Sequence, residues 1–180
     1  MDFGEDYDPY SRISELMDAE LYNEALNEAN SGLSHEPENV TLLVMAGEIV
    51  LIYHEELGID IADAAHSALT RFHKVLSLEP EHAEDWGAAA LSYLYLNEHE
   101  NALDCTNRGL ASLSSGVGFG MTNREVHTNV AEEVFDHKVR ALLGLDRMEE
   151  ARKCLFEGLT YCPGSSFLSR HIESLSSIEL

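Results

Sequence analysis

The sequence predicts an all-α fold built from repeated pairs of short helices, and three regularities lead to this prediction. Four alanines recur along the chain, and each has a leucine eight residues further on. In three of the four stretches a proline stands twelve residues after the alanine, where it would end a helix and open a loop. Recurrence of one helical unit along a chain is typical of a repeat architecture. The alanines are Ala25, Ala68, Ala102 and Ala151, and the prolines are Pro37, Pro80 and Pro163.

The most regular unit is Ala83–Leu110, which has the pattern of two amphipathic helices joined by a tight turn. Trp86, Ala90 and Tyr93 fall at i, i+4 and i+7, so they share one face of the first helix. In the second helix, small residues seven positions apart would let a neighbouring helix approach closely. These two small residues are Ala102 and Gly109.

The start of that second helix is predicted from a capping pattern. Asn97 stands before it, and Glu100 follows three residues later. This Asn-led version of the capping box would satisfy the free N–H groups of the first turn. We therefore predict Asn97 as the N-cap.

The spacings between the alanines show where residues have been added. Thirty-four residues separate Ala68 from Ala102, whereas 43 separate Ala25 from Ala68 and 49 separate Ala102 from Ala151. The second unit thus has nine extra residues, which we place near residues 54–63, as longer helices or as a loop. Fifteen extra residues precede the fourth unit, and the glycines among them predict a flexible linker over residues 115–124.

The remaining elements follow from this register. We predict one domain over residues 1–180, which ends in an amphipathic helix over residues 166–178 that covers the last apolar face. Its apolar side would hold Leu168, Ile172 and Leu175. The four helix pairs are predicted at about residues 6–39, 40–82, 83–114 and 125–165.

A 34-residue helix–turn–helix unit with these residues resembles the tetratricopeptide repeat (TPR) family. The resemblance covers about residues 6–165, and the first and fourth units match least well. It implies a right-handed superhelix whose first helices line a concave groove, and it implies a protein that binds other proteins. The residues that match the family's signature are Gly47, Ala68, Pro80, Trp86, Ala90, Tyr93, Ala102, Gly109, Ala151, Gly158 and Pro163.

The charge of the chain limits the classes of partner that we expect. The formal net charge is −22, which would repel phosphate backbones, so we expect neither nucleic acid nor an anionic membrane as a partner. A high negative charge keeps a protein soluble, which is the simpler explanation, and it would also attract a basic partner. The N-terminal residues lack the basic and apolar stretches of a secretory signal, and the three cysteines have no metal or redox spacing. We therefore expect a cytoplasmic protein.

No catalytic chemistry is predicted. The Gly116–Gly120 stretch lacks the Lys-Ser/Thr of a phosphate loop. The nine histidines show no paired set of Glu-x-x-His motifs, as helix bundles use for two metals, and no HExxH motif. We expect no cofactor, no metal and no enzymatic activity. Cys105 and Cys154 occupy equivalent places in two second helices and are predicted to be buried, whereas Cys162, beside Pro163 in a turn, is predicted to be more exposed.

The candidate binding site is the groove that the resemblance implies. The first helices that line it would be apolar on nearly two faces. One face is enough for packing within a unit, so the other needs a partner to cover it. Some TPR proteins bind the C-terminal carboxylate of a chaperone. The predicted inner face here carries acidic and apolar side chains, which would not bind a carboxylate, so we do not expect this protein to belong to that subclass. The predicted groove residues are Val44, Glu48, Leu51 and Ile52, then Glu84, Gly87, Leu91, Leu94 and Tyr95, then Glu133, Asp136, Arg140 and Leu143.

The predicted function is a non-enzymatic scaffold or adaptor that binds a protein or peptide with hydrophobic and basic residues. Alternatives are a small acidic secretion chaperone built from TPR units, or a self-assembling structural module. The groove could instead be filled by the N-terminal arm, by the 54–63 insertion or by a second copy in a homodimer. Replacing Leu94 and Tyr95 by Glu is predicted to abolish partner capture without unfolding the protein.

Overall fold

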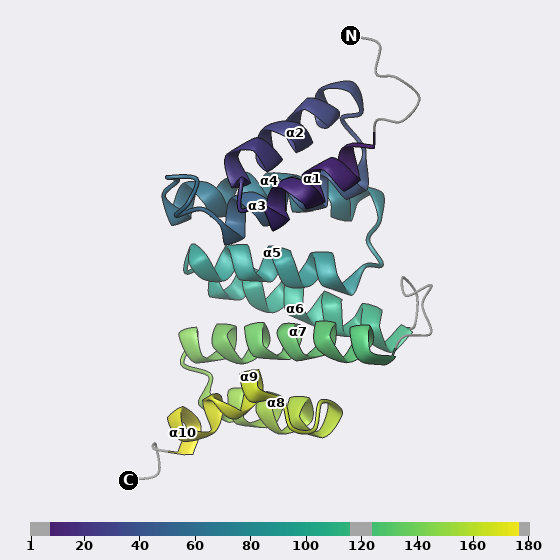
Figure 1. Ribbon diagram of the computed structural model, residues 1–180. Coiled ribbons are helices and arrows are strands. Elements are labelled where there is room, and N and C mark those ends of the chain that lie inside the picture. The colour runs from purple at the N-terminus through teal and green to yellow at the C-terminus, as the bar shows by residue number, and fades with distance from the viewer. Residues whose placement is uncertain (1–7, 116–123, 177–180) are drawn as a thin grey trace. The chain divides into compact units, whose positions relative to one another are not determined.

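The computed structural model describes residues 8–115 and 124–176, and all regular secondary structure in these ranges is helical. The chain divides into two compact units, Met1–Leu78 and Glu79–Leu180, each of which is described by itself. No helix in the described ranges is long and apolar enough to cross a membrane. The all-α prediction is confirmed (Figure 1).

Residues 8–78, the described part of the first unit, form four helices, each packed against the next in the chain. Its apolar interior includes Ile13, Ala29 and Phe72. The segment between the third and fourth helices forms a loop, so the predicted insertion connects two helices instead of extending them. The helices are α1 (Pro9–Asp18), α2 (Tyr22–His35), α3 (Val40–Ile52) and α4 (Ile61–Leu78).

The second unit is built around its longest helix, α7 (Arg124–Gly144), which packs against α5, α6 and α8. Two short helices take the place of the single C-terminal helix predicted over 166–178. The chain turns at Arg170 between them, and the residues predicted as a linker lie largely in 116–123, outside the described ranges. The other helices are α5 (Ala83–Tyr95), α6 (His99–Ser115), α8 (Met148–Tyr161), α9 (Ser166–Ser169) and α10 (His171–Ser176).

The same backbone turn joins the two helices of three units. Glu20, Asn97 and Asp146 each stand five residues before one of the recurring alanines and have φ of 57°, 58° and 57°. In all three turns the next residue donates its N–H to a carbonyl five residues back, as Glu98 does to Tyr93 at 2.9 Å. Ala25, Ala68, Ala102 and Ala151 are all fully buried.

The predicted role of Asn97 is wrong. Its left-handed backbone ends α5, and α6 begins only at His99. Asn is favoured both as an N-cap and in the left-handed conformation. Only one residue stands between Leu96, the C-cap of α5, and Glu98, which accepts the first hydrogen bond of α6. So tight a connection requires the left-handed conformation.

Replacing Glu20 by Gly should stabilise the first unit by about 0.5–1 kcal/mol, because glycine adopts the left-handed conformation without the strain of a Cβ. Asn97→Gly should gain less, because Asn tolerates this conformation better than Glu. Urea unfolding followed by circular dichroism measures both changes. A loss of stability in Glu20→Gly would mean that the glutamate side chain matters more than its backbone strain.

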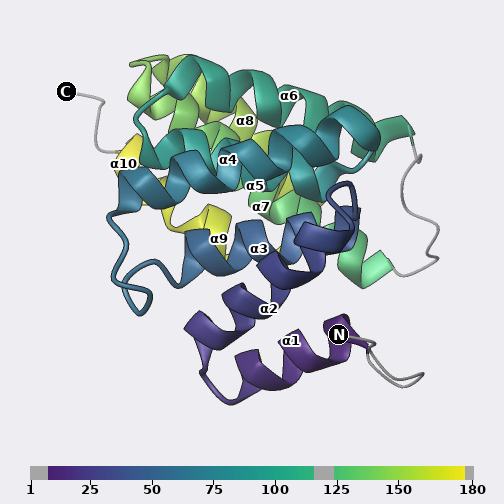
Figure 2. The same ribbon diagram turned by 90° about the horizontal axis from the view of Figure 1, so that it is seen from above.

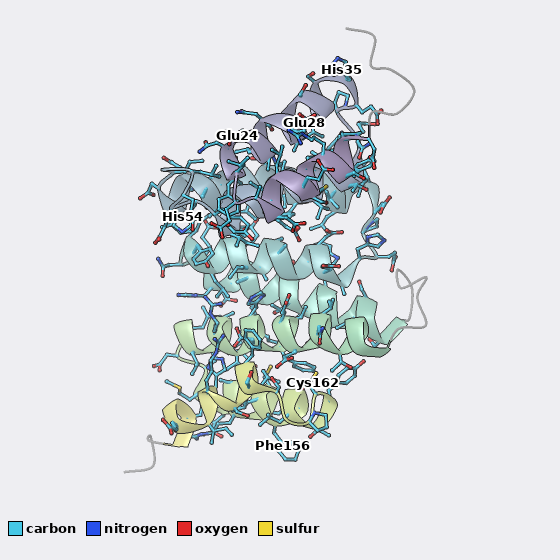
Figure 3. The ribbon with its side chains drawn as sticks, in the orientation of Figure 1. Glu24, Glu28, His35, His54, Phe156 and Cys162 are labelled. Carbon is cyan, nitrogen blue, oxygen red and sulfur yellow. The ribbon has the colours of Figure 1, made fainter. Side chains whose placement is uncertain are left out.

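Two other contacts fix the helix pairs of the second unit. A Cβ added to Gly109 would lie 3.3 Å from the Ala83 carbonyl oxygen and from Trp86 Cβ, so α6 and α5 meet there backbone to backbone. Cys162, predicted to be more exposed, is only 1% exposed. Its Sγ lies 3.5 Å from the Thr128 carbonyl oxygen on α7, because the turn before Pro163 directs it inward (Figure 3).

Candidate functional site

The candidate site in the second unit is the face made by α5 and α7, the first helices of two successive pairs. The two helices lie in contact and run in the same direction (Figure 1). The two helices pack tightly at Gly87, where an added Cβ would lie 3.3 Å from Val134 Cγ2. His137 hydrogen-bonds to the backbone of Gly87, and burial lowers its pKa to about 4, so the ring is neutral at pH 7. Gly87 is therefore a helix-packing position.

Beyond Gly87 and Val134, towards the C-terminal ends of both helices, the face consists mostly of apolar side chains, together with Arg140. Leu91 is half-buried and Tyr95 is 40% exposed on α5, and Leu143 and Arg140 are half-buried on α7. Leu94 differs from them because it is only 8% exposed and belongs to the hydrophobic core of this unit. The accessible apolar residues of this face are thus Leu91, Tyr95 and Leu143.

The other end of the face is acidic. Glu84 lies in the first turn of α5 and is exposed, as is Glu133 on α7. Burial raises the pKa of the Glu133 carboxyl, and the nearby charges of Glu84, Glu132 and Asp136 raise it further. Neither Glu84 nor Glu133 forms an ion pair with the residues that the structure describes, so this end of the face would attract a cation.

Asp136, also predicted to line the groove, is instead part of a buried ion network. Its Oδ1 accepts hydrogen bonds from Arg170 Nη2 at 2.9 Å and His171 Nε2 at 2.6 Å, and Arg140 Nη1 lies 3.8 Å from Oδ2. Burial alone would raise the pKa of Asp136, but the hydrogen bonds from His171 and Arg170 outweigh it and lower the pKa. This network fixes α9 and α10 to α7.

The predicted residues of the first unit all lie on α3. Ile52 is 58% exposed, Val44 and Glu48 are half-buried, and Leu51 is buried. Ile52 is thus the most accessible apolar residue among them.

The described residues offer no group of three or more His, Cys, Asp or Glu side chains that could hold a metal ion. All three cysteines are free and buried. Burial raises the pKa of Cys105 and Cys154 to about 12 and also raises that of Cys162. These thiols are therefore protonated at neutral pH and are weak nucleophiles.

Comparison with known proteins gives matches at the level of structure. No protein-family model and no curated protein matches the chain. The Thermus thermophilus protein TTC0263, a thermophilic TPR protein, aligns over 97% of this chain and 84% of its own, with a TM-score of 0.70 and 17% identity. The second TPR domain of human RPAP3, solved with an HSP70 peptide, aligns over 77% of this chain and 98% of its own, with a TM-score of 0.56 and 12% identity. The chain therefore has a TPR-like all-α repeat fold.

Proposed function

We propose that this protein is a non-enzymatic interaction scaffold and that the α5–α7 face binds a protein segment with apolar and basic residues. One observation carries the proposal: accessible Leu91, Tyr95 and Leu143 lie along the same two helices as the exposed carboxylates of Glu84 and Glu133. Apolar side chains give affinity when a partner covers them, and the carboxylates select for a basic neighbour.

The fold supports this kind of function. The RPAP3 domain, which shares the fold, binds a peptide. The HSP70 peptide bound to RPAP3, SGPTIEEVD, is acidic, whereas the face described above is acidic itself, so we propose a basic segment for this chain. Three free buried cysteines are compatible with a reducing compartment, and we propose the cytoplasm.

The test uses a short fluorescein-labelled peptide of alternating Leu and Lys, and its binding is measured by fluorescence anisotropy. We expect the double variant Leu91→Gln/Tyr95→Gln to bind this peptide at least about tenfold more weakly, because each lost apolar contact costs about 1–3 kcal/mol. Its melting temperature should stay within a few degrees of the wild type, because neither side chain is buried. Leu94 is left unchanged, since a polar group there would enter the core.

Phe156→Gln is the matched control, because Phe156 is the most exposed large apolar residue described and lies on α8. It should leave binding unchanged. A Ser–Lys peptide that binds equally well would show mere attraction to an acidic protein and would refute the proposed apolar contact. Equal losses in Phe156→Gln and in the double variant would refute the assignment to α5 and α7.

A further inference from the structure

A pocket of about 230 Å³ opens between α6, α7 and α8 of the second unit. α7 packs against both other helices, and α6 and α8 lie on the upper side of this unit in Figure 2. The pocket is thus lined by two second helices, α6 and α8, and by the side of α7 that carries Lys138 and Leu142, and none of its lining residues is among those of the α5–α7 face.

Positive charge gathers at this pocket in a chain that is otherwise strongly acidic. Lys138, Arg147 and Lys153 line it, and the chain has only one other lysine, Lys74. Residues 138–170 hold six of the eleven Lys and Arg residues but only four of the 33 Asp and Glu residues. The pocket is thus a local site of attraction for anions.

The lysine on α7 has no direct ion-pair partner among the described residues, although its charge helps to lower the pKa of Glu150 in the same pocket. Arg147 donates two hydrogen bonds of 2.7 Å to Glu150, and Lys153 Nζ lies 3.8 Å from Glu157 Oε1. Lys138 is partly buried, yet its ammonium group makes no hydrogen bond or ion pair with the residues that the structure describes. Partial burial removes water from this cation, and the Glu150 carboxylate nearby is already hydrogen-bonded by Arg147, so a ligand carboxylate could bind Lys138 directly.

The lining also limits the charge of the ligand. Glu150 and Glu157 stand among the three cations, so the pocket has an excess of one positive charge, and Leu103 and Leu142 give it an apolar part. A single carboxylate on a hydrocarbon stem matches this lining better than a doubly charged phosphate. Phe156, three residues after Lys153, is 73% exposed and points away from α8 (Figure 3). It provides an apolar contact for a chain that lies across α8.

We infer that this pocket binds a side-chain carboxylate of an acidic segment of a partner protein, with Lys138 as its main contact. The scaffold would then have a second site, on α6–α8, whose charge preference is opposite to that of the α5–α7 face.

The test measures anisotropy of a fluorescein-labelled Glu-rich peptide, with a Gln-rich peptide of equal length as its neutral counterpart. We expect the Glu-rich peptide to bind at low salt despite the net charge of −22, and to lose its affinity at about 0.5 M salt. Lys138→Gln should weaken it by about tenfold, and the exposed Lys153→Gln by about threefold.

Lys74→Gln is the matched control, because Lys74 is the remaining lysine and is paired with Glu38 in the first unit. It should leave binding within about twofold. Equal binding of the Gln-rich peptide, or no effect of either Lys138→Gln or Lys153→Gln, would overturn the inference. If inorganic phosphate binds and the Glu-rich peptide does not, the inference that the ligand is a partner protein is wrong. Light scattering tests whether the partner is a second copy of this chain. A mass above that of the monomer, lost in Lys138→Gln, would show self-association through this pocket and would also overturn the inference.

Discussion

Replacing Phe72 by Ala should lower the free energy of unfolding by about 3–5 kcal/mol, the range measured when a fully buried aromatic ring is removed from a core. Phe72 lies on α4 and is 0% exposed. Its ring covers Gly47 on α3, where an added Cβ would lie 2.9 Å from both Cε1 and Cζ. The ring thus occupies the space that the small residue of the first helix leaves open.

This contact makes the two positions interdependent. Gly47→Ala alone gains about 1 kcal/mol of helix propensity but displaces a buried ring, which costs about 1–3 kcal/mol. In the Phe72→Ala background the same methyl enters the cavity and meets no ring. Gly47→Ala should therefore be more favourable in the variant than in the wild type by about 1–3 kcal/mol. Urea unfolding of all four proteins by circular dichroism measures this coupling, and additive effects would contradict the contact.

The repeat register could be predicted from sequence because each unit requires small residues at the same places. Ala25, Ala68, Ala102 and Ala151 are fully buried, and three units share one backbone turn. Such positions stay visible in a sequence because only a small side chain fits between two helices in contact.

The side chains that face a partner were harder to predict. Periodicity gives the direction of a residue around its helix, but α7 contacts α5, α6, α8 and α9, so little of its surface is free. Leu94 and Leu91 are both apolar and three residues apart, yet the first is in the core and the second is half-buried. Sequence alone does not contain the spacing between helices that decides between them.

Long-range pairs were invisible for another reason. Asp136 meets Arg170 and His171 from 34 and 35 residues away in the chain, whereas helical periodicity relates only residues of the same helix. The pocket at Lys138 did leave a signal, namely the concentration of basic residues between positions 138 and 170. An argument from the overall charge of −22 averages over the chain and does not show this local excess of basic residues.

Asp85→Asn should stabilise the second unit at pH 8 by about 1–3 kcal/mol, because the wild-type carboxyl is buried in the first turn of α5 at 4% exposure. Burial raises its pKa from 3.8 to about 6; His82, whose Nδ1 lies 3.4 Å away, opposes the shift, and Glu84 and Glu79 add to it. Folding therefore favours the neutral carboxyl relative to the unfolded chain, although at pH 8 the carboxylate is ionised in both states.

The sign of the pH dependence follows from this shift. Between about pH 4 and pH 6 the unfolded chain has lost this proton and the folded protein keeps it, so stability falls as the pH rises. The two pKa values correspond to a loss of about 3 kcal/mol. The N-terminal end of the helix dipole favours the carboxylate and offsets about 0.3–1 kcal/mol of this loss.

The advantage of Asp85→Asn should therefore grow from pH 4 to pH 6, remain constant to pH 8, and be near zero below pH 4. Fluorescence of Trp86, the only tryptophan and the next residue in the chain, reports urea unfolding of this unit. Glu81→Gln is the matched control, because this nearby carboxylate is exposed and is not among the charges that shift the pKa of Asp85, so the variant should show no such dependence. If Asp85→Asn is instead less stable at pH 8, hydrogen bonds of the carboxylate at the start of α5 outweigh the cost of its burial.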